Sequence, residues 1–456
     1  MQRTCVLVVG SSVGMQSNAC ASTAWGSNWK QNCLPAWPLW GTPHAGSAFR
    51  TALGKEKPNS RRCWTASVFF GNCSFAKSWV QGKRTFDALY RRPSRQRSYL
   101  MVRGAVVLGA SGLVGQRLQQ RLANHPMFEV RALAGSARTA GTNPADLTWG
   151  LEGHAPALDL PPVFDVQDPG LVGKLHDLGV TWAFSAVPSD VALSLETRLV
   201  DGGFRVCSNA SAHRRNADVP LVVADLNPQH LRVRPEGELL HACATNCTLI
   251  PLLMPYLALH RAFGVVNYHA TSEQARSGAG YALLRGEVPL TPDIPGEAEK
   301  TMAELAWITG RLAQGQIEPA TIDGRMRCQR VDVADGHIVD VVFELAQPVA
   351  LQDVNAALDA FAPHPDAAGL PSAPLKPLMR VEGSVRREAH LWADGLGFPA
   401  EVNPATNLQA GMAVVVGDVE MEGSSRVRLR SLSHNTVRGA AGGVVLLAEL
   451  ASTQWS

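Results

Sequence analysis

This sequence of 456 residues has few of the features that mark membrane, secreted or metal-binding proteins. No apolar run approaches the roughly 18 residues of a membrane-spanning helix, and Val6–Val9 is too short for a secretory signal core. Cys243 and Cys247 lie four apart but lack the histidines or second cysteine pair of a zinc site, so we expect neither a metal nor a disulfide framework. The 46% hydrophobic and 18% charged residues are typical of a globular protein.

Acidic residues are scarce in the first hundred positions. Residues 1–100 contain 2 Asp or Glu against 14 Lys or Arg, whereas the remainder contains 37 acidic and 28 basic residues. The net charge of +3 therefore combines a strongly basic segment with an acidic body. An acidic body is not typical of a nucleic-acid-binding protein.

The same first segment lacks periodicity and holds six of the eleven Trp residues. Three interpretations are open: a non-native or disordered extension that follows from a start site placed too early, a plastid- or mitochondrion-type transit segment, or a basic functional arm. The first is favoured because a strand begins just after Met101, so we expect residues 1–100 to be dispensable. The protein is then expected in the cytoplasm, and in an organelle only if the segment is a transit sequence.

The body begins with a strand, a glycine-rich turn, a helix and a second strand. Apolar residues fill 104–109, recur at helical spacing from Leu113 to Leu122, and alternate with Glu129 and Arg131 in the second strand at 128–133. This βαβ unit predicts a doubly wound parallel sheet. Further strands are expected at 181–186, 204–208 and 219–224.

Beyond Cys247 the pattern changes to mixed helices and strands. Helices are predicted at 249–263, 353–361 and 444–450, strands at 265–270, 338–345 and 412–417, and a Pro-rich loop at 371–377. We expect an α/β protein with a Rossmann-type NADP-binding domain at 101–246, completed by a C-terminal helix within 430–456. An inserted α+β catalytic and dimerisation domain is expected at 247–429.

The turn after the first strand has the spacing of a dinucleotide-binding turn. Its glycines allow backbone N–H groups and a helix N-terminus to approach a pyrophosphate. The residues assigned to this contact are Gly109, Ser111, Gly112, Leu113, Val114 and Gly115. No acidic residue follows the second strand, where an NAD enzyme tends to bind the ribose hydroxyls. Ser136 and Arg138 stand there and can hold a 2′-phosphate, which favours NADP; the alternative is a solvated loop arginine.

A cysteine lies between a polar turn and a long apolar run. If a helix begins at Cys247, its free N–H groups and dipole lower the thiol pKa. Pro251 suits a first helical turn, whereas Pro255 is expected to kink or shorten the helix. Taken alone, Cys247 would be interpreted as a buried structural cysteine.

The residues around this cysteine change that interpretation. Gln274 follows Cys247 by 27 positions, and Arg330 and His337 lie seven apart. Together with the dinucleotide turn, over about residues 104–450, they resemble aspartate-β-semialdehyde dehydrogenase of the archaeal and fungal-like branch. That family usually has Asn-Pro where this chain has Ala244 and Thr245.

The resemblance implies roles for the catalytic residues. Cys247 would be the nucleophile, and Gln274 would contact the carbonyl or thioester. His337 would be the acid/base with a pKa near neutrality, and Arg330 would bind the substrate α-carboxylate. Without the family, His337 and Arg330 would be interpreted as an ordinary loop histidine and surface arginine.

The resemblance also implies the remaining contacts. Asn209 and Arg214 would hold the acyl phosphate. Glu297 would face the substrate ammonium and Lys300 the phosphate, although a solvated helical ion pair is the alternative for these two. Cofactor contacts are implied for Ser277, Gly278, Asn435 and Gly439.

The implied reaction is the NADPH-dependent reduction of L-aspartyl-4-phosphate to L-aspartate-4-semialdehyde, a step in lysine, threonine and methionine biosynthesis. The implied partners are small molecules, with no nucleic acid and no membrane, and the implied assembly is a homodimer or a dimer of dimers. The alternatives are a malonyl-CoA-type reductase of the same fold, an N-acetylglutamyl-phosphate reductase, or a non-catalytic dimeric homologue. Glu297 favours an amino-acid substrate.

Overall fold

The computed structural model describes residues 102–234 and 240–455. The predictions for residues 1–100 lie outside this range. Among the described residues, no helix combines the length and apolar character needed to cross a bilayer.

The first sheet has six parallel strands in the order β3-β2-β1-β4-β5-β6. These strands are β1 (Arg103–Leu108), β2 (Phe128–Gly135), β3 (Phe164–Asp165), β4 (Val180–Ser185), β5 (Arg205–Ser208) and β6 (His241–Cys243). The order reverses between β1 and β4, which is the arrangement of a Rossmann-type fold. The predicted α/β fold class is therefore confirmed.

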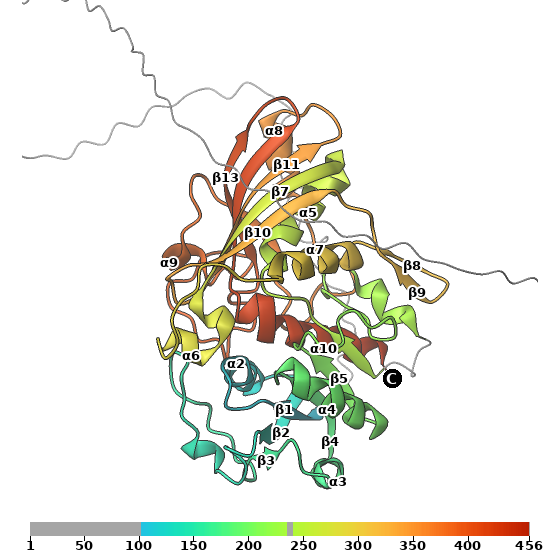
Figure 1. Cartoon of the computed structure of the whole chain (residues 1–456), viewed down its shortest axis with the longest axis vertical. Helices are drawn as coiled ribbons and strands as arrows, with labels where there is room; N and C mark the ends of the chain where they lie inside the picture. The colour runs from blue at the N-terminus through green and yellow to red at the C-terminus, as the bar shows by residue number, and fades with distance from the viewer. Residues whose placement is uncertain (1–101, 235–239, 456) are drawn as a thin grey trace, which may run out of the picture. The chain divides into compact units, whose positions relative to one another are not determined.

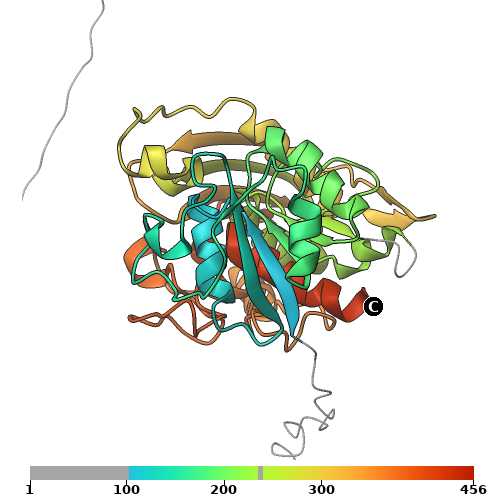
Figure 2. The ribbon, with the colours of Figure 1, turned by 90° about the horizontal axis from the view of Figure 1, so that it is seen from below.

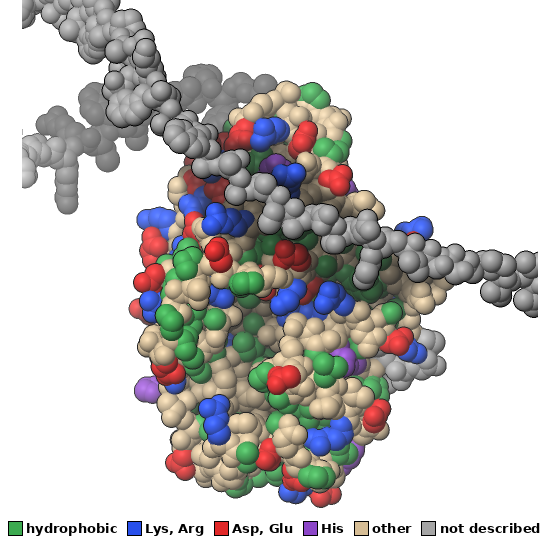
Figure 3. Space-filling model, viewed as in Figure 1, with side chains coloured by type: hydrophobic (Ala, Val, Ile, Leu, Met, Phe, Trp, Pro, Cys, Tyr) green, Lys and Arg blue, Asp and Glu red, His purple; other side chains and the backbone are tan. Residues whose placement is uncertain are grey.

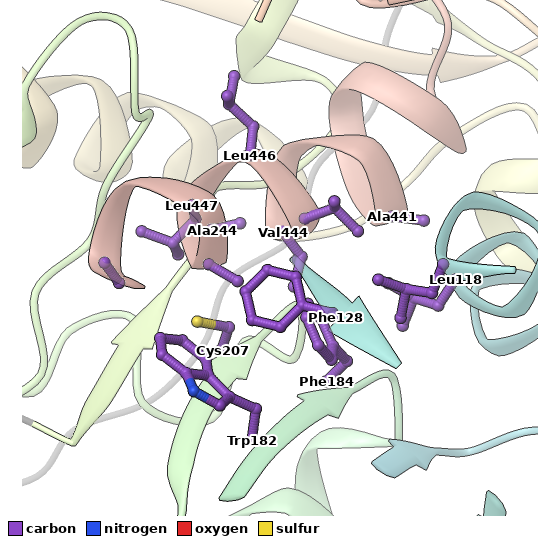
Figure 4. Packing of buried hydrophobic residues seen from close by; sticks show 14 of the residues in the cluster. Leu118, Phe128, Trp182, Phe184, Cys207, Ala244, Ala441, Val444, Leu446 and Leu447 are labelled. Atoms are coloured by element: carbon purple, nitrogen blue, oxygen red, sulfur yellow. The ribbon is translucent and has the colours of Figure 1, made fainter. Parts of the chain in front are cut away.

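Helices cover both faces of this sheet because its strands are apolar on both sides. In β1, Val107 packs toward α2 (Leu113–Leu122) and α10 (Gly442–Gln454), while Val106 packs toward α3 (Leu171–Asp177) and α4 (Ser189–Asp201). Figure 2 shows these helices on either side of the strands. In Figure 4, rings from the sheet such as Phe184 lie against Val444 of α10.

The strand expected at 219–224 is wrong. Leu221 forms an isolated bridge to Cys243, and the Asn227 side chain takes over nearby backbone hydrogen bonds. Its Oδ1 accepts from the N–H of Val223 at 2.7 Å, and its Nδ2 donates to the carbonyl of Leu221 at 3.0 Å. The short strand β6, which the sequence pattern did not reveal, forms the edge of the sheet instead.

The second sheet is mixed, in the order β10-β7-β11-β14-β13-β12. These strands are β7 (Val265–Gln274), β10 (Gly324–Arg330), β11 (His337–Leu345), β12 (Leu378–Arg380), β13 (Val414–Met421) and β14 (Arg426–Ser433). Helices α5 (Leu249–Phe263), α7 (Glu297–Ile308) and α8 (Leu351–Asp359) pack on it. Figure 1 shows the two sheets above and below α10.

Shorter elements connect these layers. They are α6 (Tyr281–Leu284), α9 (Arg387–His390), the hairpin β8 (Arg311–Ala313) and β9 (Gln316–Glu318), 3-10 turns at Pro144–Asp146, Pro228–Val233 and Arg276–Ala279, and a π-helical turn at Val437–Ala441. The π-helical turn leads directly into α10.

Helix α5 has the predicted bounds, and the expectation that Pro255 shortens it is wrong. A proline at this position leaves the carbonyl of Pro251, four residues earlier, without its helical partner. The Ser431 hydroxyl of β14 donates to that carbonyl at 2.6 Å. A side chain from the second sheet thus replaces the missing hydrogen bond and allows the helix to continue.

Candidate active site

The glycine-rich turn lies at the carboxyl end of β1, where the strand order reverses. Gly109 has φ +80°, a conformation that favours glycine, and a Cβ on Gly115 would collide with the carbonyl oxygen of Gly109. Helix α2 begins at Leu113, and its first turn contains no acidic residue. This end of the sheet therefore offers free N–H groups to an anion.

Ser136 and Arg138 lie in the turn that follows β2, which ends at Gly135. The Arg138 side chain is exposed and has no hydrogen bond or ion pair with any described residue. Its guanidinium is therefore available to bind a ligand beside the end of β2.

Cys247 and His337 form the centre of the site. The Cys247 sulfur lies 3.3 Å from Nε2 of His337, although the two residues are 90 positions apart. Nδ1 of His337 accepts the N–H of Ala275 at 3.1 Å. A neutral imidazole that accepts at Nδ1 carries its proton on Nε2, so His337 donates toward the sulfur.

The pKa values of Cys247 and His337 both differ from those expected from the sequence. The surrounding protein desolvates the sulfur and, with the nearby Glu297 carboxylate, raises the pKa of Cys247 to about 11, although Arg214 and Arg330 oppose this rise. Burial lowers the pKa of His337 to about 3, helped by the charge of Arg330. The thiol is therefore not activated by the helix terminus alone, and His337 is neutral at pH 7.

Arg330 and Gln274 are neighbours on adjacent strands, because β10 pairs with β7 in a register that aligns them. Nη1 of Arg330 donates to the carbonyl of Ala275 at 3.0 Å. A Cβ on Gly278 would lie 2.9 Å from both Arg330 Nη1 and His337 Cε1, so these groups converge. The buried Gln274 side chain instead faces Ser272, with Nε2 3.4 Å from its hydroxyl.

A cleft of about 300 Å³ is lined in part by Cys247. Ten residues proposed from the sequence line it: Val114, Asn209, Arg214, Cys247, Ser277, Gly278, Glu297, Lys300, Asn435 and Gly439. Gln274, Arg330 and His337 do not line it, nor do Ser136 and Arg138. Figure 3 shows acidic and basic side chains interspersed on the face of the molecule seen in Figure 1.

The C-terminal region forms one wall of this cleft. Nδ2 of Asn435 donates to the Ser277 hydroxyl at 2.8 Å, and its Oδ1 accepts the N–H of Gly336 at 2.8 Å. A Cβ on Gly439 would lie 2.6 Å from Cβ of Cys247. Only glycine therefore allows the π-helical turn to approach the thiol so closely.

Arg214, which also lines the cleft, is buried. Its Nη1 donates to Glu304 at 3.1 Å, and its Nη2 donates to the carbonyl of Asn209 at 2.6 Å. Burial disfavours the charged guanidinium, but the Glu304 carboxylate outweighs this effect and raises the pKa of Arg214. Lys300 lines the same cleft and is exposed.

Nine residues that line the cleft were not proposed as site residues from the sequence, and Glu304 and Asn246 are two of them. Glu304 lies four positions after Lys300 and seven after Glu297, a spacing that places all three on one face of α7. Asn246 precedes the cysteine, and its Oδ1 accepts the N–H of Leu249 at the start of α5. Its Nδ2 is buried and has no partner among the described residues, so a donor is available beside the thiol.

A buried group of two histidines and a carboxylate lies near the Asn209 loop. Among the described residues, Glu196, His213 and His241 bring ligand-type atoms within 4.8 Å of one another. Glu196 already accepts from the Ser208 hydroxyl at 2.7 Å and lies 3.0 Å from Nε2 of His241. These hydrogen bonds tie α4 to β5 and β6 beside the cleft.

Comparisons with known proteins identify the family to which the chain is similar. The family model for the semialdehyde dehydrogenase NAD-binding domain matches residues 105–234. The aspartate-semialdehyde dehydrogenase of Methanothermobacter thermautotrophicus is 35% identical over 359 residues, which is 75% of this chain and 97% of that protein. The malonyl CoA reductase (NADP) of Metallosphaera sedula is 28% identical over 361 residues, which is 76% of this chain and 96% of that protein.

Solved structures of aspartate-semialdehyde dehydrogenases also resemble this chain. The crystal structure of aspartate semialdehyde dehydrogenase with NADP from Candida albicans is 28% identical, with a TM-score of 0.63, and the match covers 77% of this chain and 99% of that one. The resemblance found in the sequence is confirmed. Because the identity to the archaeal relative extends over nearly its whole length, this chain belongs to the aspartate-semialdehyde dehydrogenase family.

Proposed function

We propose that this protein catalyses the NADPH-dependent reductive dephosphorylation of L-aspartyl-4-phosphate to L-aspartate-4-semialdehyde, a step toward lysine, threonine and methionine. The observation that carries the proposal is the 3.3 Å approach of the Cys247 sulfur to Nε2 of His337 beside the cleft. The family membership, and the NADP of the Candida albicans structure, support it. The exposed Arg138 supports NADP as the cofactor.

The first step is attack of the Cys247 sulfur on the acyl carbon, which forms a thioester and breaks the bond to phosphate; the thiol proton leaves with the phosphate as hydrogen phosphate. Arg214 and Lys300 line the same cleft and offset the charge of the departing phosphate. A guanidinium has five N–H donors, and Arg214 uses two in the hydrogen bonds described above. The remaining donors, together with Nδ2 of Asn246, are available to phosphate oxygens.

The second step reduces the thioester. Bound NADPH would supply the hydride to the acyl carbon, and the resulting oxyanion would collapse to the aldehyde and the Cys247 thiolate, which takes up a proton from solvent. The Nε2–H of His337 faces the reacting sulfur and is placed to stabilise this oxyanion with a hydrogen bond. Arg330, which converges on His337 near Gly278, binds the substrate carboxylate.

Substrate binding also helps to activate the thiol. Glu297 is one of the groups that raises the pKa of Cys247. Thr248 directly follows Cys247, and its hydroxyl lies 3.5 Å from Glu297 Oε1. A substrate ammonium that pairs with Glu297 removes this effect, so an amino-acid substrate promotes formation of the thiolate.

A paired activity assay tests the substrate. Phosphate-dependent reduction of NADP with aspartate semialdehyde is compared with CoA-dependent reduction of NADP with malonate semialdehyde. We expect the first to be faster by at least about tenfold, because Glu297 and Arg214 recognise ammonium and phosphate. A faster CoA-dependent reaction would favour the acyl-CoA reductase, the function named for the Metallosphaera sedula relative.

The expected assembly is a homodimer or a dimer of dimers, joined through the second sheet. Helices α5 and α8 pack on one face of this sheet. The other face carries exposed or half-buried side chains such as Val266, Asp340 and Arg428. Light scattering at micromolar concentration should give at least twice the mass of one chain, and a stable monomer would contradict this part of the proposal.

A further inference from the structure

Glu304 is a buried carboxylate on which three donors from two segments of the chain converge. Its Oε1 accepts from Nη1 of Arg214 at 3.1 Å. Its Oε2 accepts from the Thr245 hydroxyl at 2.6 Å and from the N–H of Asn246 at 2.9 Å. All four residues are less than 9% exposed, so water does not compete strongly for these hydrogen bonds.

The three partners belong to the two halves of the site. Arg214 follows β5 and faces the phosphate end of the cleft, whereas Thr245 and Asn246 lead directly into Cys247. Helix α7 also carries Glu297 and Lys300 on the cleft side. One carboxylate therefore joins the anion-binding guanidinium to the backbone that carries the thiol.

We propose that Glu304 is a positioning residue that couples the phosphate-binding Arg214 to the Thr245–Asn246 turn of the nucleophile. This inference rests on the proposed function for its kinetic consequences. Glu304 holds Arg214 in one orientation and charge state, and it fixes the position from which Cys247 attacks. It touches no reacting atom itself.

Glutamine cannot replace this carboxylate. Both carboxylate oxygens accept hydrogen bonds, whereas a glutamine side chain has one accepting oxygen and a donating NH2 group. In E304Q, the NH2 group must face either the Arg214 guanidinium or the donors of Thr245 and Asn246. Either arrangement removes the hydrogen bonds to Arg214 or those to Thr245 and Asn246, and it leaves buried donors unpaired.

The experiment compares E304Q with E299Q. Glu299 lies on the same helix but is exposed, and the described residues give it no hydrogen bond or ion pair. In the phosphorylating direction, with aspartate semialdehyde and NADP, E304Q should raise the KM for inorganic phosphate about ten- to a hundredfold. The KM for NADP should stay within about twofold, and E299Q should match the wild type in both values.

A second readout does not depend on the substrate. The rate at which iodoacetamide alkylates Cys247, followed by mass spectrometry between pH 7 and 10, reports the environment of the thiol. E304Q should change this profile by at least about threefold, and T245V should change it in the same direction. T245V keeps the pair of Arg214 and Glu304, so its KM for phosphate should change less than that of E304Q.

The outcomes separate the inference from the proposed function. A wild type without activity on aspartate semialdehyde refutes the function, and the alkylation profiles then decide the inference alone. An E304Q variant with a wild-type profile refutes the inference, as does one in which only the KM for phosphate changes. A lower melting temperature combined with an unchanged profile and unchanged KM values shows a purely structural role, which also refutes it.

Discussion

The two sheets contribute to the site in different ways. The first sheet presents mainly backbone: tight glycine turns and a helix N-terminus at the carboxyl ends of parallel strands, with the side chains of Asn209 and Arg214 after β5. The second sheet and its flanking segments present side chains, including Gln274, Arg330 and His337. Cys247 lies between the two, after β6 of the first sheet and before α5, which packs on the second.

This difference matches the chemistry that each region is proposed to perform. A dinucleotide is the same in every turnover, and rigid backbone recognises it well. A reacting acyl group changes charge and shape, so it requires side chains with tuned electrostatics. The following changes test whether the two contributions are separable.

Removal of the thiol should have the largest effect. Cys247→Ala eliminates the covalent route and should lower kcat at least about 10³-fold, without altering the affinity of the first sheet for NADPH. Steady-state kinetics and cofactor titration measure both quantities. In the wild type, iodoacetamide should alkylate Cys247 before Cys207, whose pKa is raised by burial on the first sheet. Near-normal turnover in the alanine variant would refute the mechanism.

Arg138 is the charged side chain that the first sheet is proposed to add to its backbone contacts. A charge-assisted hydrogen bond contributes about 1.5–3 kcal/mol, so Arg138→Ala should raise the KM for NADPH roughly ten- to a hundredfold. NADH has no 2′-phosphate, and its kinetics should hardly change. Equal losses for both cofactors would mean that Arg138 acts on folding or on the shared pyrophosphate.

Ser431 tests how far the second sheet depends on side-chain hydrogen bonds. Ser431→Ala leaves the carbonyl of Pro251 unpaired inside α5 and should lower the free energy of unfolding by about 1–3 kcal/mol. Ser433→Ala is the matched control, because that buried hydroxyl has no partner among the described residues. Chemical denaturation measures the free energy of unfolding of both variants. An equal decrease in both would show that the hydrogen bond from Ser431 to Pro251 does not stabilise α5.

Glu297 should give the smallest effect of the four changes. Its charge contributes to the raised pKa of Cys247, so Glu297→Gln lowers that pKa and increases the thiolate fraction at any pH well below about 11. Alkylation of Cys247 at pH 8 should become faster, by less than about tenfold. A slower reaction in this variant would mean that the loss of local structure outweighs the loss of charge.

The sequence predicted elements well where the pattern is local. The apolar spacing predicted the bounds of α2 and α5, and the glycines predicted the turn between β1 and α2. The strand order of the second sheet was not predicted, because β7, β11 and β14 pair across long stretches of chain. Strand β6 was also missed, since its three residues carry no periodic signal.

In the candidate site, too, features that depend on residues far apart in the sequence could not be predicted. Motif spacing identified Cys247, Arg330 and His337 as a group, and the structure brings them together. The shifted pKa values of the thiol and the imidazole could not be predicted, because burial depends on residues remote in sequence. Glu304 was missed for a related reason: its partners lie 58 to 90 positions away.

The contact of Gly439 with Cys247 has a consequence for protein synthesis. The wall of the cleft and the helix that completes the core of the first sheet are both made from the C-terminal segment that begins at Val437. A nascent chain on the ribosome has already exposed its dinucleotide turn and its cysteine while this segment is still in the exit tunnel. The thiol therefore acquires its final surroundings only after the segment from Val437 has emerged and packed, and the reactive centre is assembled later than the strands that precede it.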